Sequence, residues 1–381
     1  MTEIIFSAIG TLVCGSEEVK YNELSDDTMR SLYSLSSAHD VSHLVSAELD
    51  AQGLLKIDDE ISDKFRKQHM ISIFRYERMN YEFERICKTL EKNQIPFVVL
   101  KGAVMRRYYP EPWMRTSSDI DFLINISDLE KIKSVLLEEL SIEYKSSWHH
   151  EHSFFSESGV HIEFHDNLNP EDNRKKQVLE NAWDNVKCVD GWDYMYEMLD
   201  EMFYFYHIAH MAKHFEEGGC GIRPFLDLWI LDHCIEYDNV KRDDLLKFGG
   251  LLTFANVARH LSEVWFGDVD HDNTTMRMEQ YILRGGVYGT FENRVVMKQS
   301  KSGGKFKYIL SRIFVPYDSL KFMYPILQKH SWLMPFMQVR RWLMILRPDV
   351  AKRAKMEMNI NDNMEKLKAE EMKTFLDCIG L

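Results

Sequence analysis

With 381 residues the chain is too long for one ordinary hydrophobic core, so two or three packed units are expected. Hydrophobic residues make up 45% and aromatic residues 12%, which is enough apolar surface to offset the entropy of ordering the chain and excludes a disordered protein. No basic leader precedes the first apolar run, and no segment reaches the roughly 18 uninterrupted apolar residues of a membrane span. We therefore expect a cytoplasmic protein without a transmembrane segment.

The formal charge of −13 is unevenly distributed along the chain. Residues 305–355 contain eleven Lys and Arg against two acids, which leaves a local charge of +9. A basic segment of this kind is typical of a surface that meets a phosphate-rich substrate, an acidic partner or an anionic membrane. Docking on the acidic remainder of the same chain explains it equally well. The six cysteines form no CxxC pair, so the sequence indicates neither a disulfide framework nor a zinc ribbon.

Residues 1–94 are predicted to form an N-terminal helical segment. Apolar residues recur at steps of three and four from Phe65 to Leu90, as one buried stripe along a helix requires. Asn93 and Pro96 are typical of the end of such a helix.

Residues 95–190 are predicted to form a small α/β core. A short β-rich apolar run at 96–100 is followed by a glycine turn into a helix, and 118–125 alternates as a strand does. Ser127 lies three residues before Glu130, a spacing typical of a capping box that begins the next helix. A hairpin spanning 152–165 follows. The predicted order is strand, helix, strand, helix, hairpin.

Residues 191–381 are predicted to form a C-terminal helical domain, with Met-rich and aromatic stretches broken at glycine pairs. The predicted fold class is therefore α+β: a mixed sheet with helices forms the core, and helical domains flank it on both sides.

Acidic residues on two of the predicted strands suggest a metal site. Asp119 and Asp121 are two apart in a strand, so their carboxylates share one face, and their neighbours are apolar. In the run "VHIEFHD" a third acid, Glu163, shares a face with His161 and His165. If the two strands are adjacent, three carboxylates converge into the oxygen cage that Mg²⁺ prefers beside nucleotide phosphates. Two ions held there could activate an attacking hydroxyl and stabilise a leaving pyrophosphate.

The chain also resembles a known family. The run "IPFVVLKGAVMRRYYPEPWMRTSSDIDFLI", with "HIEFHDNL" and "HIAHMAKHFEEGGCGIRPFLDL" after it, is similar to the bacterial uncharacterised nucleotidyltransferases of the polymerase-beta-like superfamily. The resemblance implies that Asp119 and Asp121 bind two Mg²⁺ ions, with Mn²⁺ as an alternative. It also implies that Glu163, as the third metal ligand, assists deprotonation of an acceptor, and that an NTP such as ATP is the substrate.

The resemblance further implies that Gly102 marks the turn into a phosphate-facing helix. The sequence departs from the superfamily here, because Gly102-Ala103 replaces the usual Gly-Ser and the gap to Asp119 is longer than usual. The phosphate cradle therefore lacks a serine hydroxyl. We expect Lys101, Arg115, Ser117 and Ser118 to bind the nucleotide in its place, although Arg115 could instead neutralise the acids.

Further nucleotide contacts are predicted on the last strand of the hairpin and in the helices after the core. His165 shares the strand face of Glu163, while His207, His210, Lys213 and His214 fall on or beside one helical stripe. The histidines have no carboxylate or cysteine at a recognised zinc spacing, so Lys213 and His214 are expected to face phosphate or base instead. Arg223 and Asp227 could form an interdomain ion pair or contact the nucleotide.

The predicted function is transfer of a nucleoside monophosphate from an NTP to an acceptor hydroxyl or phosphate, with release of pyrophosphate. The strongly negative overall charge favours a small-molecule or natural-product acceptor over a nucleic acid. Three alternatives remain open: a kinase that uses the same metals, a toxin-like transferase that modifies tRNA through the basic segment, and a catalytically silent scaffold.

Overall fold

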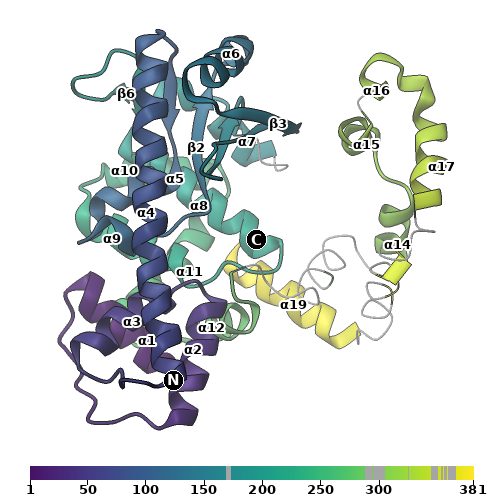
Figure 1. Cartoon of the computed structure of the whole chain (residues 1–381). Helices are drawn as coiled ribbons and strands as arrows, with labels where there is room; N and C mark the ends of the chain where they lie inside the picture. Colours follow the sequence, from purple (N-terminus) through teal and green to yellow (C-terminus); the bar gives the residue numbers. More distant parts are fainter. Residues whose placement is uncertain are drawn as a thin grey trace.

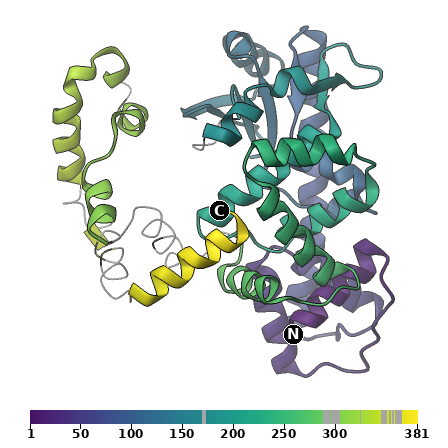
Figure 2. The same ribbon diagram turned by 180° about the vertical axis from the view of Figure 1, so that it is seen from behind.

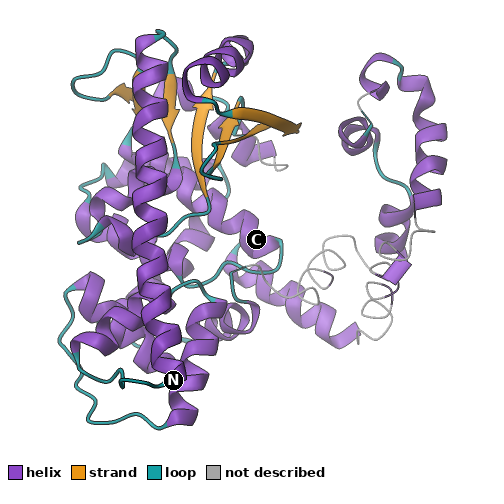
Figure 3. Cartoon of the chain, in the orientation of Figure 1, coloured by secondary structure: helices purple, strands orange, loops and turns teal. Residues whose placement is uncertain are grey.

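The structure is a computed structural model in which a mixed β-sheet is surrounded by helices (Figures 1 and 3). This is the α+β fold predicted from the sequence. Among the residues that the structure describes, no helix is both long and apolar enough to cross a membrane. The described residues are 1–168, 173–287, 295, 305–324, 326–344, 351–352, 355, 358 and 366–381.

The sheet has seven strands in the order β3-β4-β5-β2-β1-β7-β6. At its centre β2 pairs antiparallel with β1 and parallel with β5, and β1 pairs parallel with β7. The expected hairpin is present as β4 and β5, which pair antiparallel. The strands are β1 (Phe97–Val99), β2 (Asp119–Ile124), β3 (Glu143–Trp148), β4 (Glu151–Phe155), β5 (His161–His165), β6 (Val186–Cys188) and β7 (Met195–Met198).

The sheet extends beyond the core boundary that was predicted at residue 190. β7 begins at Met195 and adds a parallel neighbour to β1, while β6 pairs with β7 at the edge. Tyr196 of β7 lies opposite Val98 of β1 in the register. β7 therefore belongs to a stretch that the sequence pattern assigns to the helical domain, whereas β6 lies just inside the predicted core.

The helix α4 connects the N-terminal helices to the sheet, as Figure 1 shows. It ends at Lys92, close to the predicted position. At its other end, the side chain of Asp59 caps the first turn by accepting a hydrogen bond from the backbone N–H of Ser62. Phe83 of α4 stacks on Phe122 of β2, with ring centroids 6.0 Å apart. The N-terminal helices are α1 (Thr2–Ile9) with a π-helical turn (Gly10–Cys14), α2 (Asp26–Ala38), α3 (Ser42–Ala51) and α4 (Glu60–Lys92).

The helices inside the core are short apart from α6. The capping box predicted at Ser127 does not form, because Ile126–Asp128 makes a 3-10 turn and α6 begins one residue later. Asp128 occupies the N-cap position without a side-chain hydrogen bond. The core helices are α5 (Lys101–Met105), the 3-10 turns Arg106–Tyr108, Pro112–Met114 and Ala182–Asn185, α6 (Leu129–Leu140) and α7 (Asn173–Leu179).

The chain after the sheet is helical in its described part. In the view from behind, the helices that follow β7 lie in front of the sheet, on the side opposite α4 (Figure 2). The last helix returns to this group, because Phe375 packs against Phe215 and Tyr281. The helices are α8 (Asp200–Glu216), α9 (Arg223–Cys234), α10 (Asn239–Phe248), α11 (Leu252–Phe266), α12 (Asn273–Gly285), α14 (Lys305–Ile313), α15 (Tyr317–Met323), α16 (Ile326–Lys329), the 3-10 turn Ser331–Leu333, α17 (Met334–Met344) and α19 (Lys366–Ile379).

The two faces of the central strands differ in chemistry. Ile120 and Phe122 of β2 are buried, and Phe122 stacks on Phe164 of β5 at 5.1 Å. Side chains alternate along a strand, so Asp119 and Asp121 project from the other face. The apolar face supplies the packing that fixes β2 beside β5, and that pairing determines which polar groups meet on the opposite face.

Candidate active site

Three carboxylates meet on the polar face of the sheet. The parallel pairing of β2 with β5 places Asp121 opposite Glu163 and Asp119 opposite His161. Ligand atoms of Asp119, His161 and Glu163 lie within 4.8 Å of one another, and so do those of Asp121, Glu163 and His165. The two groups share Glu163, and together they form one cluster of three acids and two histidines, which we call the acidic cluster.

Lys101 is the cation of the acidic cluster. It lies two residues after the end of β1 and has φ of +42°, a left-handed conformation that is uncommon outside glycine and that often accompanies functional sites. Its Nζ lies 3.0 Å from Oδ1 of Asp121, whose side chain is only 3% exposed. On its other side the ammonium contacts the hydroxyl of Tyr206 from α8. Lys101 therefore joins the end of β1, the centre of β2 and the helical domain.

The acids of the cluster respond differently to this environment. Burial acts to raise the pKa of Asp121, but the Lys101 ammonium and the hydrogen bond from His165 outweigh it and hold that pKa below its usual range. Burial raises the pKa of Glu163 to about 8, and the neighbouring carboxylates of Asp121 and Asp119 add to the shift. Burial, followed by Asp121, also raises the pKa of Asp119. One cation is therefore too few to ionise all three acids at neutral pH.

The two histidines and a serine complete the cluster. Nε2 of His165 lies 3.0 Å from Oδ1 of Asp121 and 3.6 Å from Oε2 of Glu163. Nδ1 of His161 lies 3.4 Å from Oε1 of Glu163. The hydroxyl of Ser118 donates to Oδ2 of Asp119 at 3.0 Å. Each carboxylate is thus oriented by at least one neighbour.

This donor set fits a divalent cation. Carboxylate oxygens suit Mg²⁺ and Mn²⁺, and imidazole nitrogens extend the range of metals that can bind. Burial first and the neighbouring carboxylates second raise the pKa values of Asp119 and Glu163, and a second positive charge would favour their ionised forms. Asp119, Asp121 and Glu163 are the residues that would hold the ion, with His161 and His165 beside them.

Gly102 lies against the residues that precede β2. A Cβ at Gly102 would lie 3.2 Å from Cβ and 3.3 Å from Oγ of Ser117, so a larger residue would displace that serine. Ser117 also accepts a hydrogen bond from Arg106, a buried residue that the sequence did not single out. Burial, reinforced by nearby Arg115, lowers the pKa of Arg106 to about 10. The chain between β1 and β2 is therefore tied together around Ser117.

Two arginines predicted to contact the nucleotide are engaged in ion pairs in the structure. Arg115 forms a buried two-pronged pair with Asp227 of α9, with Nε 2.7 Å from Oδ1 and Nη2 2.8 Å from Oδ2. Arg223 donates to Oδ2 of Asp40 at 2.7 Å and to Thr116 at 3.0 Å. Arg223 and Asp227 thus do not pair with each other, and each is paired with a residue from an earlier part of the chain.

The helix α8 brings one unpredicted residue to the cluster. Tyr206 contacts Lys101 and is buried, which is the main reason that its pKa lies above the usual value. His214 approaches His210 at 3.2 Å, and burial lowers the pKa of His214 to about 4. Lys213 is exposed. Tyr206 lies four residues before His210 on the same helical stripe, and that spacing is the sequence signal that would have identified it.

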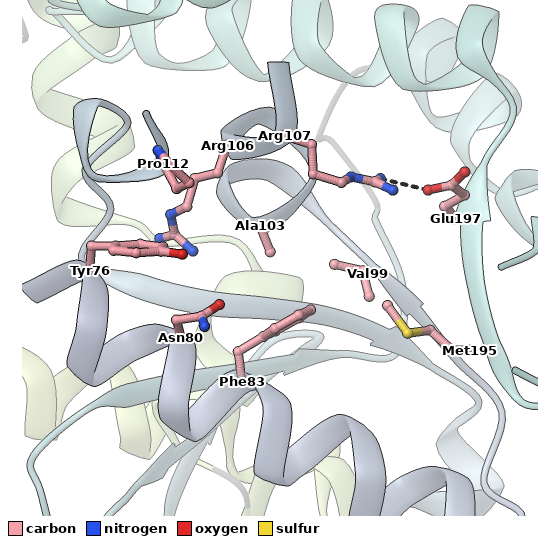
Figure 4. A pocket seen from close by; sticks show the side chains of 10 residues that line it. All are labelled: Tyr76, Asn80, Phe83, Val99, Ala103, Arg106, Arg107, Pro112, Met195 and Glu197. Atoms are coloured by element: carbon pink, nitrogen blue, oxygen red, sulfur yellow. Dashed lines mark hydrogen bonds and ion pairs between the residues drawn. The ribbon is translucent and has the colours of Figure 1, made fainter. Parts of the chain in front are cut away.

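A separate cavity of about 190 Å³ lies on the other face of the sheet (Figure 4). Val99 of β1 and Phe83 of α4 line it, together with Arg106. An ion pair between Arg107 and Glu197, with N and O 2.6 Å apart, closes one end, as the dashed line in Figure 4 shows. Because Val99 pairs with Phe122 and shares its face, the β-sheet separates this cavity from the acidic cluster.

One of three comparisons with known proteins found a match. Residues 25–267 match the family described as "Uncharacterised nucleotidyltransferase", and this span includes every residue of the acidic cluster, Lys101 and Tyr206. No curated protein and no solved structure is similar enough to count as a match. Since the matched span is well over half of the 381 residues, the chain belongs to the family of uncharacterised nucleotidyltransferases.

Proposed function

We propose that this protein is a metal-dependent nucleotidyltransferase that moves a nucleoside monophosphate from an NTP to an acceptor hydroxyl or phosphate and releases pyrophosphate. The observation that carries the proposal is the meeting of Asp119, Asp121 and Glu163 on adjacent parallel strands. Membership of the nucleotidyltransferase family supports the reaction class.

The three acids have separate roles in this proposal. Asp119 and Asp121 hold Mg²⁺ or Mn²⁺, which when bound supplies positive charge to the phosphates of the nucleotide. Glu163 completes the ligand set and is the candidate base for the acceptor, because a bound cation would offset the neighbouring carboxylates that add to its raised pKa and would favour its ionised form. His165, at 3.0 Å from Asp121, orients that carboxylate.

Lys101 is a candidate ligand for the transferred phosphate. Its ammonium already lies beside Asp121, and contact with Tyr206 keeps it at the cluster. A cation placed where negative charge develops stabilises the transition state of phosphoryl and nucleotidyl transfer. His214 and Lys213 of α8 extend along the same helix as Tyr206 and are candidates for contact with the rest of the nucleotide.

Labelled nucleotides test the reaction class directly. The protein is incubated with Mg²⁺ and each NTP, labelled at either the α or the γ phosphate, together with pools of small metabolites or of tRNA. Nucleotidyl transfer moves the label of the α-labelled NTP to the acceptor, and the pyrophosphate released from this NTP is unlabelled. Transfer of the γ label alone identifies a kinase. If the natural protein transfers no more label than the Asp121→Asn variant does, the protein is a silent scaffold.

The acceptor class is tested in the same assay. We expect the label to appear in the small-molecule pool. If it appears in tRNA instead, neutralising Arg340 and Arg341 of α17 should abolish that transfer, because phosphate contacts supply most of the affinity for nucleic acid. Both arginines lie in a part of the basic segment that the structure describes.

A further inference from the structure

A second cavity, of about 280 Å³, lies at the edge of the sheet where β2 and β5 begin. Since these strands are parallel, their first residues share this edge, and the lining residues directly precede Asp119 and His161. We call it the arginine cavity. Its lining residues are Arg75, Arg78 and Met79 of α4, Ser117 and Ser118 before β2, and Gly159 and Val160 before β5.

Its two arginines have no carboxylate partner among the residues that the structure describes. Other arginines of α4 do: Arg66 pairs with Asp63 and Arg85 with Glu82, each with N and O 3.0 Å apart. Arg78 donates instead to the carbonyl oxygen of Ser158 at 3.2 Å, while its Nε is buried without an acceptor.

Arg75 has neither a hydrogen bond nor an ion pair within the described part of the chain. Two guanidinium groups without an acid partner are notable in a chain whose formal charge is −13. A buried donor that lacks an acceptor is costly, so an anion that entered the cavity would satisfy it. The charge and the hydrogen-bonding capacity of the cavity both favour an anionic ligand.

The wall of the arginine cavity is continuous with the acidic cluster. Ser118 lines the cavity, and its hydroxyl donates to Oδ2 of Asp119 at 3.0 Å. The hydroxyl of Ser117, another lining residue, donates to the backbone carbonyl of Asp119 at 3.2 Å. A molecule bound by the acidic cluster at one end therefore has a positively charged cavity at the adjacent edge of the sheet.

We propose that the arginine cavity binds phosphate groups, and that these are the β and γ phosphates of the NTP whose α phosphate lies at the acidic cluster. This assignment rests on the proposed function. The planar guanidinium fork matches phosphate oxygens in geometry, and two such groups place several charged donors in one cavity. Arg75 and Arg78 would thus supply the phosphate contacts that the serine missing after Gly102 does not make.

The same chemistry would also suit the phosphate of a phosphorylated acceptor, so the experiment separates the two sources. Calorimetry measures binding of Mg²⁺-NTP, of the matching NMP, and of inorganic tripolyphosphate without metal. The variants are Arg75→Gln, Arg78→Gln and the double substitution. Lys67→Gln is the matched control, because it removes one exposed positive charge from α4 outside the cavity.

We expect each arginine variant to weaken binding of Mg²⁺-NTP and of tripolyphosphate roughly tenfold or more, since hydrogen bonds to charged groups are strong. Binding of the NMP should stay unchanged, and the control should match the natural protein. Equal losses for NTP and NMP, or no loss for NTP, would overturn the proposal.

Two outcomes separate this inference from the proposed function. Binding of Mg²⁺-NTP that depends on Arg75 and Arg78, without transfer of an α label, supports the cavity and contradicts the nucleotidyl transfer. Binding of tripolyphosphate that depends on the arginines, with no binding of any NTP, overturns the assignment to the nucleotide and identifies another phosphate source.

Discussion

Lys101 supplies the positive charge within a group of three acids. Its ammonium lies 3.0 Å from Asp121. Burial opposes the charged form, yet the Asp121 carboxylate holds the pKa of Lys101 above its usual range. The same cation lowers the pKa of Asp121, while its smaller effect on Glu163 leaves that pKa raised by burial and by the neighbouring carboxylates. The charge of this one side chain therefore affects how strongly the cluster attracts a metal.

Replacing Lys101 with Met keeps the length of the side chain and removes its charge. In EDTA the variant should melt about 2–4 °C or more below the natural protein, because Asp121 loses its counter-charge. Addition of Mn²⁺ should raise the Tm of the variant more than that of the natural protein. Lys64→Met, which removes an exposed pair with Glu60, is the control. Equal metal-induced shifts in all three proteins would contradict this account.

For individual residues, the sequence predicts which side chains of one strand share a face better than it predicts which residues of separate elements form a pair. The two-residue spacing of Asp119 and Asp121 predicts a shared face, and the histidines around Glu163 follow by the same alternation. Arg115 could not be placed in this way, because its partner Asp227 is 112 residues away. Arg223 pairs with Asp40 across 183 residues. Pairs at that separation depend on how whole elements pack, which local patterns do not encode.

Between elements, the buried pair of Arg115 and Asp227 joins the segment before β2 to α9. Asp227 is 1% exposed and also accepts a hydrogen bond from Tyr109 at 2.7 Å. A charged pair in such a place is held by its hydrogen bonds, and removing one partner leaves the other charge buried. The pair fixes the start of β2, and with it Asp119, relative to the helical domain.

Asp227→Asn should lower the free energy of unfolding by about 3–5 kcal/mol, because Arg115 then has no charged partner. Combining Asp227→Leu with Arg115→Met should cost less than Asp227→Asn alone, since both buried charges are removed. Urea denaturation of the natural protein, of the single variants Asp227→Asn, Asp227→Leu and Arg115→Met, and of the double variant measures this. A double variant whose loss equals the sum of the two single losses would show that the residues do not act as a pair.

Buried histidines in the flanking helices make stability depend on pH. His43 of α3 is 4% exposed and donates from Nε2 to the carbonyl of Met114 at 2.9 Å. Burial lowers its pKa to about 4, whereas an unfolded histidine titrates near 6.5. Between these values the unfolded chain takes up a proton that the folded chain does not. The stabilisation is therefore complete above about pH 6.5 and is lost as the pH falls toward 4.

The free energy of unfolding should fall by up to about 1.4 kcal/mol per pH unit for each such histidine over that range. Urea titrations at pH 7, 6, 5 and 4.5 measure the slope, and His43→Gln should have a shallower one. His214, whose pKa is also about 4, contributes to the slope that remains. Parallel curves for the variant and the natural protein would exclude His43 as a source of the pH dependence.

The strands that the sequence did not predict have weak hydrophobic periodicity. β3 is exposed along its whole length, so it lacks the alternation of a half-buried strand. β6 and β7 have three and four residues, which is too short for a periodic signal. By contrast α4 runs for 33 residues with a continuous apolar stripe, and its existence and its end were both predicted.

For the whole molecule, the last helix completes the core of the helical domain. Phe375 and Leu376 of α19 are each 3% exposed, and Arg277 of α12 lies over the ring of Phe375 at 5.0 Å. Leu320, Tyr324 and Leu327, between α12 and α19 in the chain, form a hydrophobic cluster of their own. Among the described residues after α12, those of α19 therefore pack in the main core, whereas Leu320, Tyr324 and Leu327 pack in a separate cluster.

Phe375→Ala should lower the free energy of unfolding by about 3–5 kcal/mol, because it opens a cavity beside Phe215 and Tyr281. Phe336→Ala in α17 is the matched control, since its ring is 63% exposed. Its cost should stay within about 0.5 kcal/mol. Comparable losses in the two variants, measured by urea denaturation, would show that α19 is not part of the main core.

The central claim is that Asp119, Asp121 and Glu163 hold a divalent cation together, and binding of Mn²⁺ followed by electron paramagnetic resonance tests it most directly. The natural protein should bind Mn²⁺ in the presence of a non-hydrolysable NTP, and Asp121→Asn and Glu163→Gln should each weaken that binding about tenfold or more. Asp166→Asn, whose carboxylate accepts from His150 and His152 outside the cluster, should leave it unchanged. Equal Mn²⁺ binding in all four proteins would contradict the account.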